Sequence, residues 1–158
     1  MRKMCSAFAA LSACVVIAAC APAPQTSNTP AAGQTMPASI IDPYLAIQED
    51  LAQDRMDSVK QNAGNLATAA TALGAPAMKI DTAAVQLAAT TTIADARDRF
   101  GALSEAIVAY KDGLHLKNPD GVKQAFCPMV VKPWLQKGDS ISNPYYGSEM
   151  STCGSFTQ

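Results

Sequence analysis

Histidine is nearly absent from this sequence, and so are the motifs on which many enzymes depend. The chain has one histidine, His115, and one tryptophan among 158 residues. It contains no glycine-rich phosphate loop, no histidine pair typical of a metal hydrolase and no Cys-x-x-Cys redox motif. Ser104 precedes His115 by 11 residues, about three helical turns, which is too far for a nucleophile and its base. The sequence therefore predicts that the protein is not an enzyme.

Charge is also scarce and nearly balanced. Charged residues make up 16% of the chain, with 12 basic and 13 acidic side chains. Removal of a signal peptide that contains Arg2 and Lys3 would leave 10 basic and 13 acidic residues, a net charge of −3. A slightly acidic chain of this kind does not fit nucleic acid or an anionic surface. We therefore expect no nucleic-acid partner.

The start of the chain has the pattern of a secretory signal peptide. Arg2 and Lys3 precede a largely apolar segment, residues 7–19. This segment is shorter than the roughly 20 apolar residues of a membrane span. It ends Ile-Ala-Ala-Cys at Cys20, which resembles a bacterial lipobox. We expect residues 1–19 to be removed and Cys20 to carry the lipid that anchors the protein in a membrane.

The residue after Cys20 bears on the destination of such a lipoprotein. An aspartate there would favour retention in the inner membrane, and this chain has Ala21 instead. In this respect the protein is similar to outer-membrane lipoproteins of bacteria with two membranes. We expect it to be lipid-anchored in the outer membrane, with its domain facing the periplasm.

A tether and then a folded domain are predicted after Cys20. Residues 20–41 are predicted to be the lipidated cysteine and a flexible tether, because the chain is uncharged there and lacks a hydrophobic period as far as residue 39. Residues 42–155 are predicted to form one domain. Its first helix should open with Asp42 as N-cap and Pro43 as the first helical residue.

Three further helices are predicted. Asp54, Asp81 and either Thr92 or Thr91 are suitable N-caps for them, Gly74 should end the second helix, and the fourth should end near Gly113 to His115. Apolar residues recur at helical spacing: Val59, Ala63, Leu66, Ala70 and Leu73 in the second helix, Val85 and Ala88 in the third, and Ile93, Ala96, Phe100, Leu103, Ile107 and Tyr110 in the fourth. Short connections between such helices predict a mainly α fold, an up-down bundle of about four helices.

Two polar residues flank the apolar stripe of the fourth helix. We expect Arg97 to pair with a carboxylate such as Asp57 or Glu49, and Ser104 to form a hydrogen bond across helices. Both are predicted to have structural roles.

The last third of the chain should form a small irregular or β lobe. Pro128, Pro133 and Pro144 break any long helix there. Short strands are expected at residues 122–126, 129–131 and 134–141. The aromatic residues of this region, Trp134, Tyr145 and Tyr146, should form the hydrophobic body of the lobe.

Several spaced motifs of this chain resemble a known bacterial domain. They are Arg97-x-x-Phe100-x-x-Leu103-Ser104, Phe126-Cys127-Pro128-Met129, Trp134-Leu135-Gln136, Ile141-x-Asn143-Pro144-Tyr145-Tyr146-Gly147 and Met150-x-x-Cys153-Gly154. On these motifs, residues 42–155 resemble a periplasmic domain of unassigned function that occurs in secreted proteins and lipoproteins. That domain also occurs fused to adaptor subunits of heavy-metal (copper and silver) efflux systems. The resemblance implies the cell envelope, soft-metal handling and efflux components as partners, and it implies no established activity.

Cys127 and Cys153 are the cysteines that remain after processing and lipidation, and two interpretations of them stay open. An even pair in an oxidising compartment favours a disulfide, which would close a loop of about 25 residues and stabilise the fold by roughly 3–4 kcal/mol. Alternatively, their thiolates could bind Cu(I) or Ag(I) together with Met129 and Met150, since soft sulfur ligands select these ions. The disulfide is the preferred interpretation, and both require the chain near Cys153 to fold back onto Cys127.

The sequence thus predicts a non-catalytic envelope lipoprotein that binds Cu(I) or Ag(I) or assists a heavy-metal efflux system. The alternative is a structural or interaction lipoprotein whose C-terminal lobe is a disulfide-stapled cap without a metal role. No other cofactor is predicted.

Overall fold

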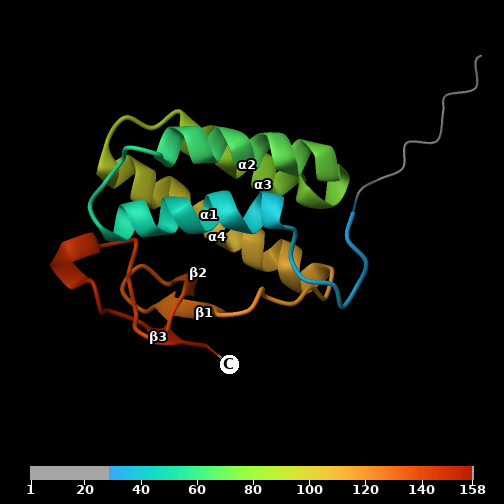
Figure 1. Ribbon diagram of the computed structural model, residues 1–158. Helices are drawn as coiled ribbons and strands as arrows, with labels where there is room; N and C mark the ends of the chain where they lie inside the picture. The colour runs from blue at the N-terminus through green and yellow to red at the C-terminus, as the bar shows by residue number, and fades with distance from the viewer. Residues whose placement is uncertain (1–28, 158) are drawn as a thin grey trace, which may run out of the picture.

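A computed structural model describes residues 29–157, which form four α-helices and a small three-stranded sheet (Figure 1). The elements in chain order are α1 (Ala38–Ala52), α2 (Val59–Leu73), the 3-10 turn η1 (Ala75–Ala77), α3 (Met78–Ala88), α4 (Ile93–Gly113), β1 (Val122–Cys127), β2 (Lys132–Lys137), the 3-10 turn η2 (Gly147–Met150) and β3 (Ser155–Phe156). The predicted mainly α bundle with a small β lobe is confirmed. The predicted signal peptide and Cys20 lie outside the described residues.

The elements are stacked in layers (Figure 1). Helices α2 and α3 form one outer layer, α1 and α4 lie in the middle, and the sheet covers the other side of α1 and α4. The strand order is β2-β1-β3, and both pairings are antiparallel. Ala125, at the centre of β1, lies opposite Trp134 on one side and opposite Phe156 on the other. The sheet therefore brings the end of the chain back onto β1.

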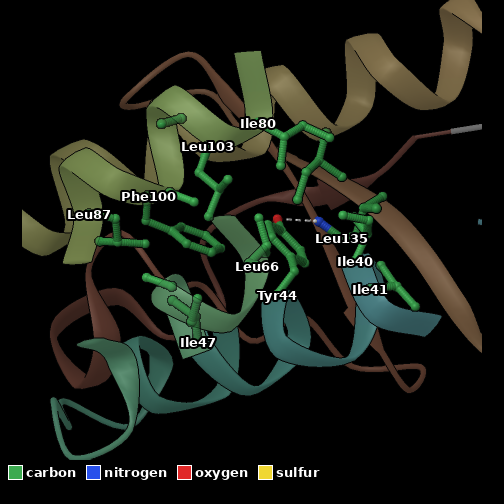
Figure 2. Packing of buried hydrophobic residues seen from close by; sticks show 14 of the residues in the cluster. Ile40, Ile41, Tyr44, Ile47, Leu66, Ile80, Leu87, Phe100, Leu103 and Leu135 are labelled. Carbon is green, nitrogen blue, oxygen red and sulfur yellow. Dashed lines mark hydrogen bonds between the residues drawn. The ribbon is translucent and has the colours of Figure 1, made fainter. Parts of the chain in front are cut away.

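The core lies where the middle helices meet the sheet and the outer helices. Phe100 of α4 is fully buried and its ring stacks on that of Tyr44 of α1, with centroids 5.1 Å apart. The Tyr44 hydroxyl accepts a hydrogen bond from the Leu135 N–H at 3.0 Å, which ties α1 to β2 (Figure 2). It also shares a 2.8 Å hydrogen bond with Ser104 Oγ, so the predicted bond of Ser104 across helices is confirmed.

The predicted apolar stripes of two helices are confirmed. All five stripe residues of α2 are buried, and so are those of α4 except the half-buried Ile93. Of the two predicted N-caps of α4, Thr92 is the one used, since its Oγ1 accepts the Asp95 N–H at 3.2 Å. Helix α4 ends at Gly113, within the predicted range of Gly113 to His115. Local pattern and tertiary burial agree in these two helices.

The predicted start of the first helix is wrong. Helix α1 begins at Ala38, so Asp42 is not an N-cap and Pro43 lies inside the helix. Ile40 and Ile41 are both buried in the core. Because Pro43 lies in the second turn, it removes one i→i−4 hydrogen bond, and the burial of the two isoleucines outweighs that loss.

The predicted caps of the next two helices are also wrong. Helix α2 begins at Val59, and Asp54 lies in the preceding loop with a φ of 56°. Helix α3 begins at Met78, which places Asp81 in its first turn. The predicted stripe residue Val85 is 56% exposed. The buried face of α3 consists of Ile80, Ala83, Ala84 and Leu87.

The part of the predicted tether that the structure describes packs against the domain. Thr35 forms a parallel bridge with Lys117, and the Gly33 N–H donates to the His115 carbonyl at 2.9 Å. Met36 is 3% exposed and belongs to the core. These backbone bonds satisfy polar groups just beyond the C-terminal end of α4. The folded unit therefore begins before residue 42, the predicted domain boundary.

The strands of the lobe differ from prediction in their bounds. Strand β1 lies where it was expected, but residues 129–131 form part of the turn between β1 and β2. Strand β2 ends at Lys137 instead of residue 141. Pro133 is accommodated in β2 because this strand is at the edge of the sheet, where a missing N–H does not break a ladder.

Candidate functional site

The structure brings the two cysteines together. Cys127 is the last residue of β1 and is fully buried, whereas Cys153 lies between η2 and β3 and is half-buried. The pairing of Phe126 with Ser155 in the sheet carries the chain next to Cys153 back to the end of β1. The two side chains interact with each other, and both are free thiols.

Hydrogen-bond donors converge on the sulfur of Cys127. Burial raises the pKa of this thiol, but hydrogen bonds from the Val130 N–H, the Asn143 side chain, the Met129 N–H and the Cys153 thiol outweigh it, so that the pKa is lowered. Burial raises the pKa of Cys153, and its bond to the Cys127 sulfur raises it further. Donors that point at a sulfur favour its anionic form. Of the two thiols, Cys127 is therefore the one whose deprotonation the surroundings favour.

The turn after Cys127 aims two of these donors. Residues 128–131 connect β1 to β2, and Val131 in this turn has a φ of 56°. A positive φ is unfavourable for a β-branched residue and costs on the order of 1–3 kcal/mol. The Val131 side chain is 66% exposed, so its own burial does not offset this cost. The strained turn directs the N–H groups of Met129 and Val130 toward the sulfur.

The two methionines of the predicted sulfur site contribute backbone groups. Met129 provides its N–H to the Cys127 sulfur, while its side chain is 61% exposed. The Met150 carbonyl accepts the Cys153 N–H at 3.1 Å, and this residue is half-buried. Across residues 29–157, no group of three or more His, Cys, Asp and Glu side chains could hold a metal ion. The contacts that the structure gives between this site and the two methionines are thus made by their backbone groups.

Asn143 is a member of the site that sequence reasoning passed over. It is fully buried, and its side-chain amide donates to Cys127 Sγ at 3.4 Å and to the Cys153 carbonyl at 2.6 Å. Its side-chain oxygen accepts the Tyr145 N–H at 2.7 Å. An asparagine before a proline usually indicates only a turn. The one signal in the sequence that could have identified Asn143 is its place in the motif that ends at Gly147.

The predicted lobe aromatics are buried to different degrees. Trp134 is fully buried and its ring meets that of Tyr145 edge-on, with centroids 5.9 Å apart. The Trp134 Nε1–H donates to Gln136 Oε1 at 2.9 Å, and the Tyr145 hydroxyl donates to the Pro133 carbonyl at 2.5 Å. These two form the packed body of the lobe. Tyr146 is only half-buried.

Arg97 joins the lobe to the bundle. Its Nε donates to the Pro144 carbonyl at 3.1 Å, and its Nη2 donates to the Leu51 carbonyl at 2.9 Å and pairs with Asp54. The predicted partners Asp57 and Glu49 are therefore wrong. The pair could not be identified from spacing because Asp54 and Arg97 lie 43 residues apart.

The Asp54 carboxylate should make the stability of the protein depend on pH in the acid range. Hydrogen bonds from Ser148 and then Arg97 lower its pKa from 3.8 to about 2. A depressed native pKa stabilises the fold at pH values above the unfolded pKa, and this contribution is lost as the pH falls toward the native one. We expect Asp54→Asn to lower the free energy of unfolding at pH 6, and the difference from wild type to vanish as the pH falls from about 4 to about 2.

Urea unfolding of both proteins across this pH range measures the effect. Asp57→Asn, which changes an exposed carboxylate of the same loop, is the matched control and should leave stability unchanged at each pH. A difference between Asp54→Asn and wild type that stays constant down to pH 2 would contradict the assignment.

Comparisons with known proteins identify no relative of this chain. Among the described residues, no helix has the length and apolar character needed to cross a membrane. No protein-family model matches the sequence, and neither a curated protein nor a solved structure shows significant similarity to it.

Proposed function

We propose that this chain is a non-catalytic envelope lipoprotein that binds one Cu(I) or Ag(I) ion between Cys127 and Cys153. The observation that carries the proposal is the pair of adjacent free thiols, one of them favoured as a thiolate by converging N–H donors. Thiolates are the ligands that select soft monovalent ions. Donors already directed at the Cys127 sulfur support a charged ligand in a buried position.

The size of the donor set argues against the common divalent metals. Structural zinc is held by four side chains, and within residues 29–157 no third His, Asp or Glu joins the two cysteines. Two thiolates are sufficient for Cu(I) or Ag(I). The half-buried position of Cys153 leaves a route by which an ion or a metal-carrying molecule could reach the pair.

The cellular setting of the proposal depends on the sequence. The lipobox pattern at Cys20 and the alanine after it favour a lipid anchor in the outer membrane. The resemblance to a domain fused to efflux adaptor subunits favours a role beside heavy-metal efflux components in the periplasm. A chain of net charge −1 with so few charged residues favours no nucleic-acid partner.

A Cu(I) competition titration tests this function. We expect the reduced mature protein, kept in detergent, to take one Cu(I) per chain from a chromophoric Cu(I) chelator. Cys127→Ser and Cys153→Ser should each reduce the affinity by more than the about 10–100-fold that loss of a supporting hydrogen bond costs. Met129→Ala should bind as wild type does, because its side chain is largely exposed. Wild-type protein that takes no Cu(I) would refute the metal function.

The second candidate is a lobe stapled by a Cys127–Cys153 disulfide, with an interaction role and no metal. The same convergence of the two thiols favours it, and such a bridge would stabilise the fold by roughly 3–4 kcal/mol. The mass of the mature protein isolated without reductant separates the two candidates. A chain lighter by two hydrogens and free of metal supports the staple, and a chain carrying copper or silver supports the metal site.

A further inference from the structure

We infer that Asn143 is a positioning residue. It sets the separation of the two thiols so that both can bind the same soft atom. This inference rests on the proposed function, because it concerns the same pair of cysteines and says which residue holds them in place. Its basis is one side-chain amide that contacts both cysteines, at 3.4 Å from Cys127 Sγ and at 2.6 Å from the Cys153 carbonyl oxygen.

The cysteines belong to different segments, so the separation of their thiols depends on the contacts between these segments. Cys127 is held by β1, whereas Cys153 lies in the connection between η2 and the two-residue strand β3. The Cys153 N–H bonds only the nearby Met150 carbonyl, a local contact that does not refer to β1. The pairing of Phe126 with Ser155 brings the two segments together, and the amide of Asn143 links the Cys153 carbonyl directly to the Cys127 sulfur.

Asn143 is itself held in place from several directions. Its N–H donates to the Ser151 carbonyl at 2.8 Å, and its carbonyl accepts the Gly147 N–H at 3.1 Å. The side-chain oxygen accepts the Tyr145 N–H at 2.7 Å, which fixes the amide so that its NH₂ group faces the cysteines. With no exposed surface, the side chain has no water to replace these partners. Asn143 can therefore hold the Cys153 backbone in a fixed position relative to the Cys127 sulfur.

A neighbouring buried amide provides the matched control. Gln48 of α1 is 5% exposed, and its Nε2 donates to the Ser142 carbonyl at 2.9 Å. It therefore holds the residue next to Asn143 through the same kind of bond. This hydrogen bond reaches Ser142 and neither cysteine. Loss of Gln48 should weaken the packing of this segment and leave the geometry of the thiols unchanged.

The test uses phenylarsine oxide, a probe that requires two correctly spaced thiols and is independent of copper. Its arsenic forms two As–S bonds with the reduced pair, the oxide oxygen leaves as water with the two thiol protons, and no electrons are exchanged. We expect Asn143→Asp, which keeps the shape and the acceptor for Tyr145 but removes the NH₂ donor, to bind the probe at least about tenfold more weakly. Asn143→Ala should show the same loss, and Gln48→Ala should bind as wild type does.

The outcomes separate positioning from general support of the fold. Folded Asn143 variants that bind the arsenical as wild type does would overturn the inference. A loss as large in Gln48→Ala would do so too, and so would a failure of both Asn143 variants to fold while Gln48→Ala folds. A Cu(I) titration of the same proteins gives the second readout. Wild-type protein that binds the arsenical but no Cu(I) would refute the proposed function. The role of Asn143 would then be decided by the binding of the arsenical to the Asn143 variants.

Discussion

Phe100→Ala is expected to lower the free energy of unfolding by about 3–5 kcal/mol, the usual cost of truncating a buried aromatic residue. Phe100 is fully buried, stacks on Tyr44 at 5.1 Å and contacts the Tyr145 ring at 5.9 Å. Phe100 therefore packs helix α4 against α1 and against the C-terminal lobe. Removal of the Phe100 ring would leave a cavity. The neighbouring rings of Tyr44 and Tyr145 cannot easily move into it, because hydrogen bonds of their hydroxyl groups hold both in place.

Urea denaturation followed by far-UV circular dichroism measures this loss. Since a domain of this size is stable by only about 5–15 kcal/mol, the variant should melt at a much lower temperature than wild type. Val85→Ala is the control, because Val85 also lies on a helix but is 56% exposed, and it should change stability by no more than about 0.5 kcal/mol. Equal effects of the two substitutions would mean that Phe100 is not part of the core.

Gly154→Ala should be the most damaging change next to the thiol pair. Gly154 has a φ of 133°, which is unfavourable for residues with a side chain, and this strain costs roughly 1–3 kcal/mol. A Cβ atom there would lie 2.6 Å from Cη2 of Trp134 and 2.9 Å from the Phe126 carbonyl oxygen. Overpacking of a fully buried ring adds roughly another 1–3 kcal/mol. Because Cys153 is the preceding residue, any relief of the clash would also move its thiol.

Comparison with Gly138→Ala isolates the second effect, the overpacking against Trp134. Gly138 also has a positive φ, 92°, but a Cβ atom at this position would meet nothing within 4 Å. Thermal unfolding should therefore show a larger loss for Gly154→Ala than for Gly138→Ala, and only Gly154→Ala should alter the near-UV circular dichroism of Trp134. Equal losses for the two variants would show that the close approach to Trp134 has no energetic consequence.

Local signals in the sequence were sufficient to predict two of the helices. The apolar stripes of α2 and α4 and the Thr92 cap were predicted correctly, because a helix relates residues three and four positions apart. The starts of α1 and α2 were wrong where a local signal conflicted with burial. Asp42 and Asp54 are both suitable caps, yet α1 continues upstream because Ile40 is buried, and Asp54 is used by Arg97 instead.

The sequence also indicated which residues to consider at the site, namely the cysteine pair and the aromatic residues near it. How these residues are arranged follows from the way the chain packs. This packing buries Cys127, leaves the Met129 side chain largely in solvent, and places Asn143 between the cysteines. These contacts join β1 to a connection that returns through β3, and the hydrogen bonds of Asn143 to Cys127 and Cys153 span 16 and 10 residues. Spacing in the sequence carries no information about such contacts, because they depend on how the sheet folds back and on which polar groups burial leaves without water.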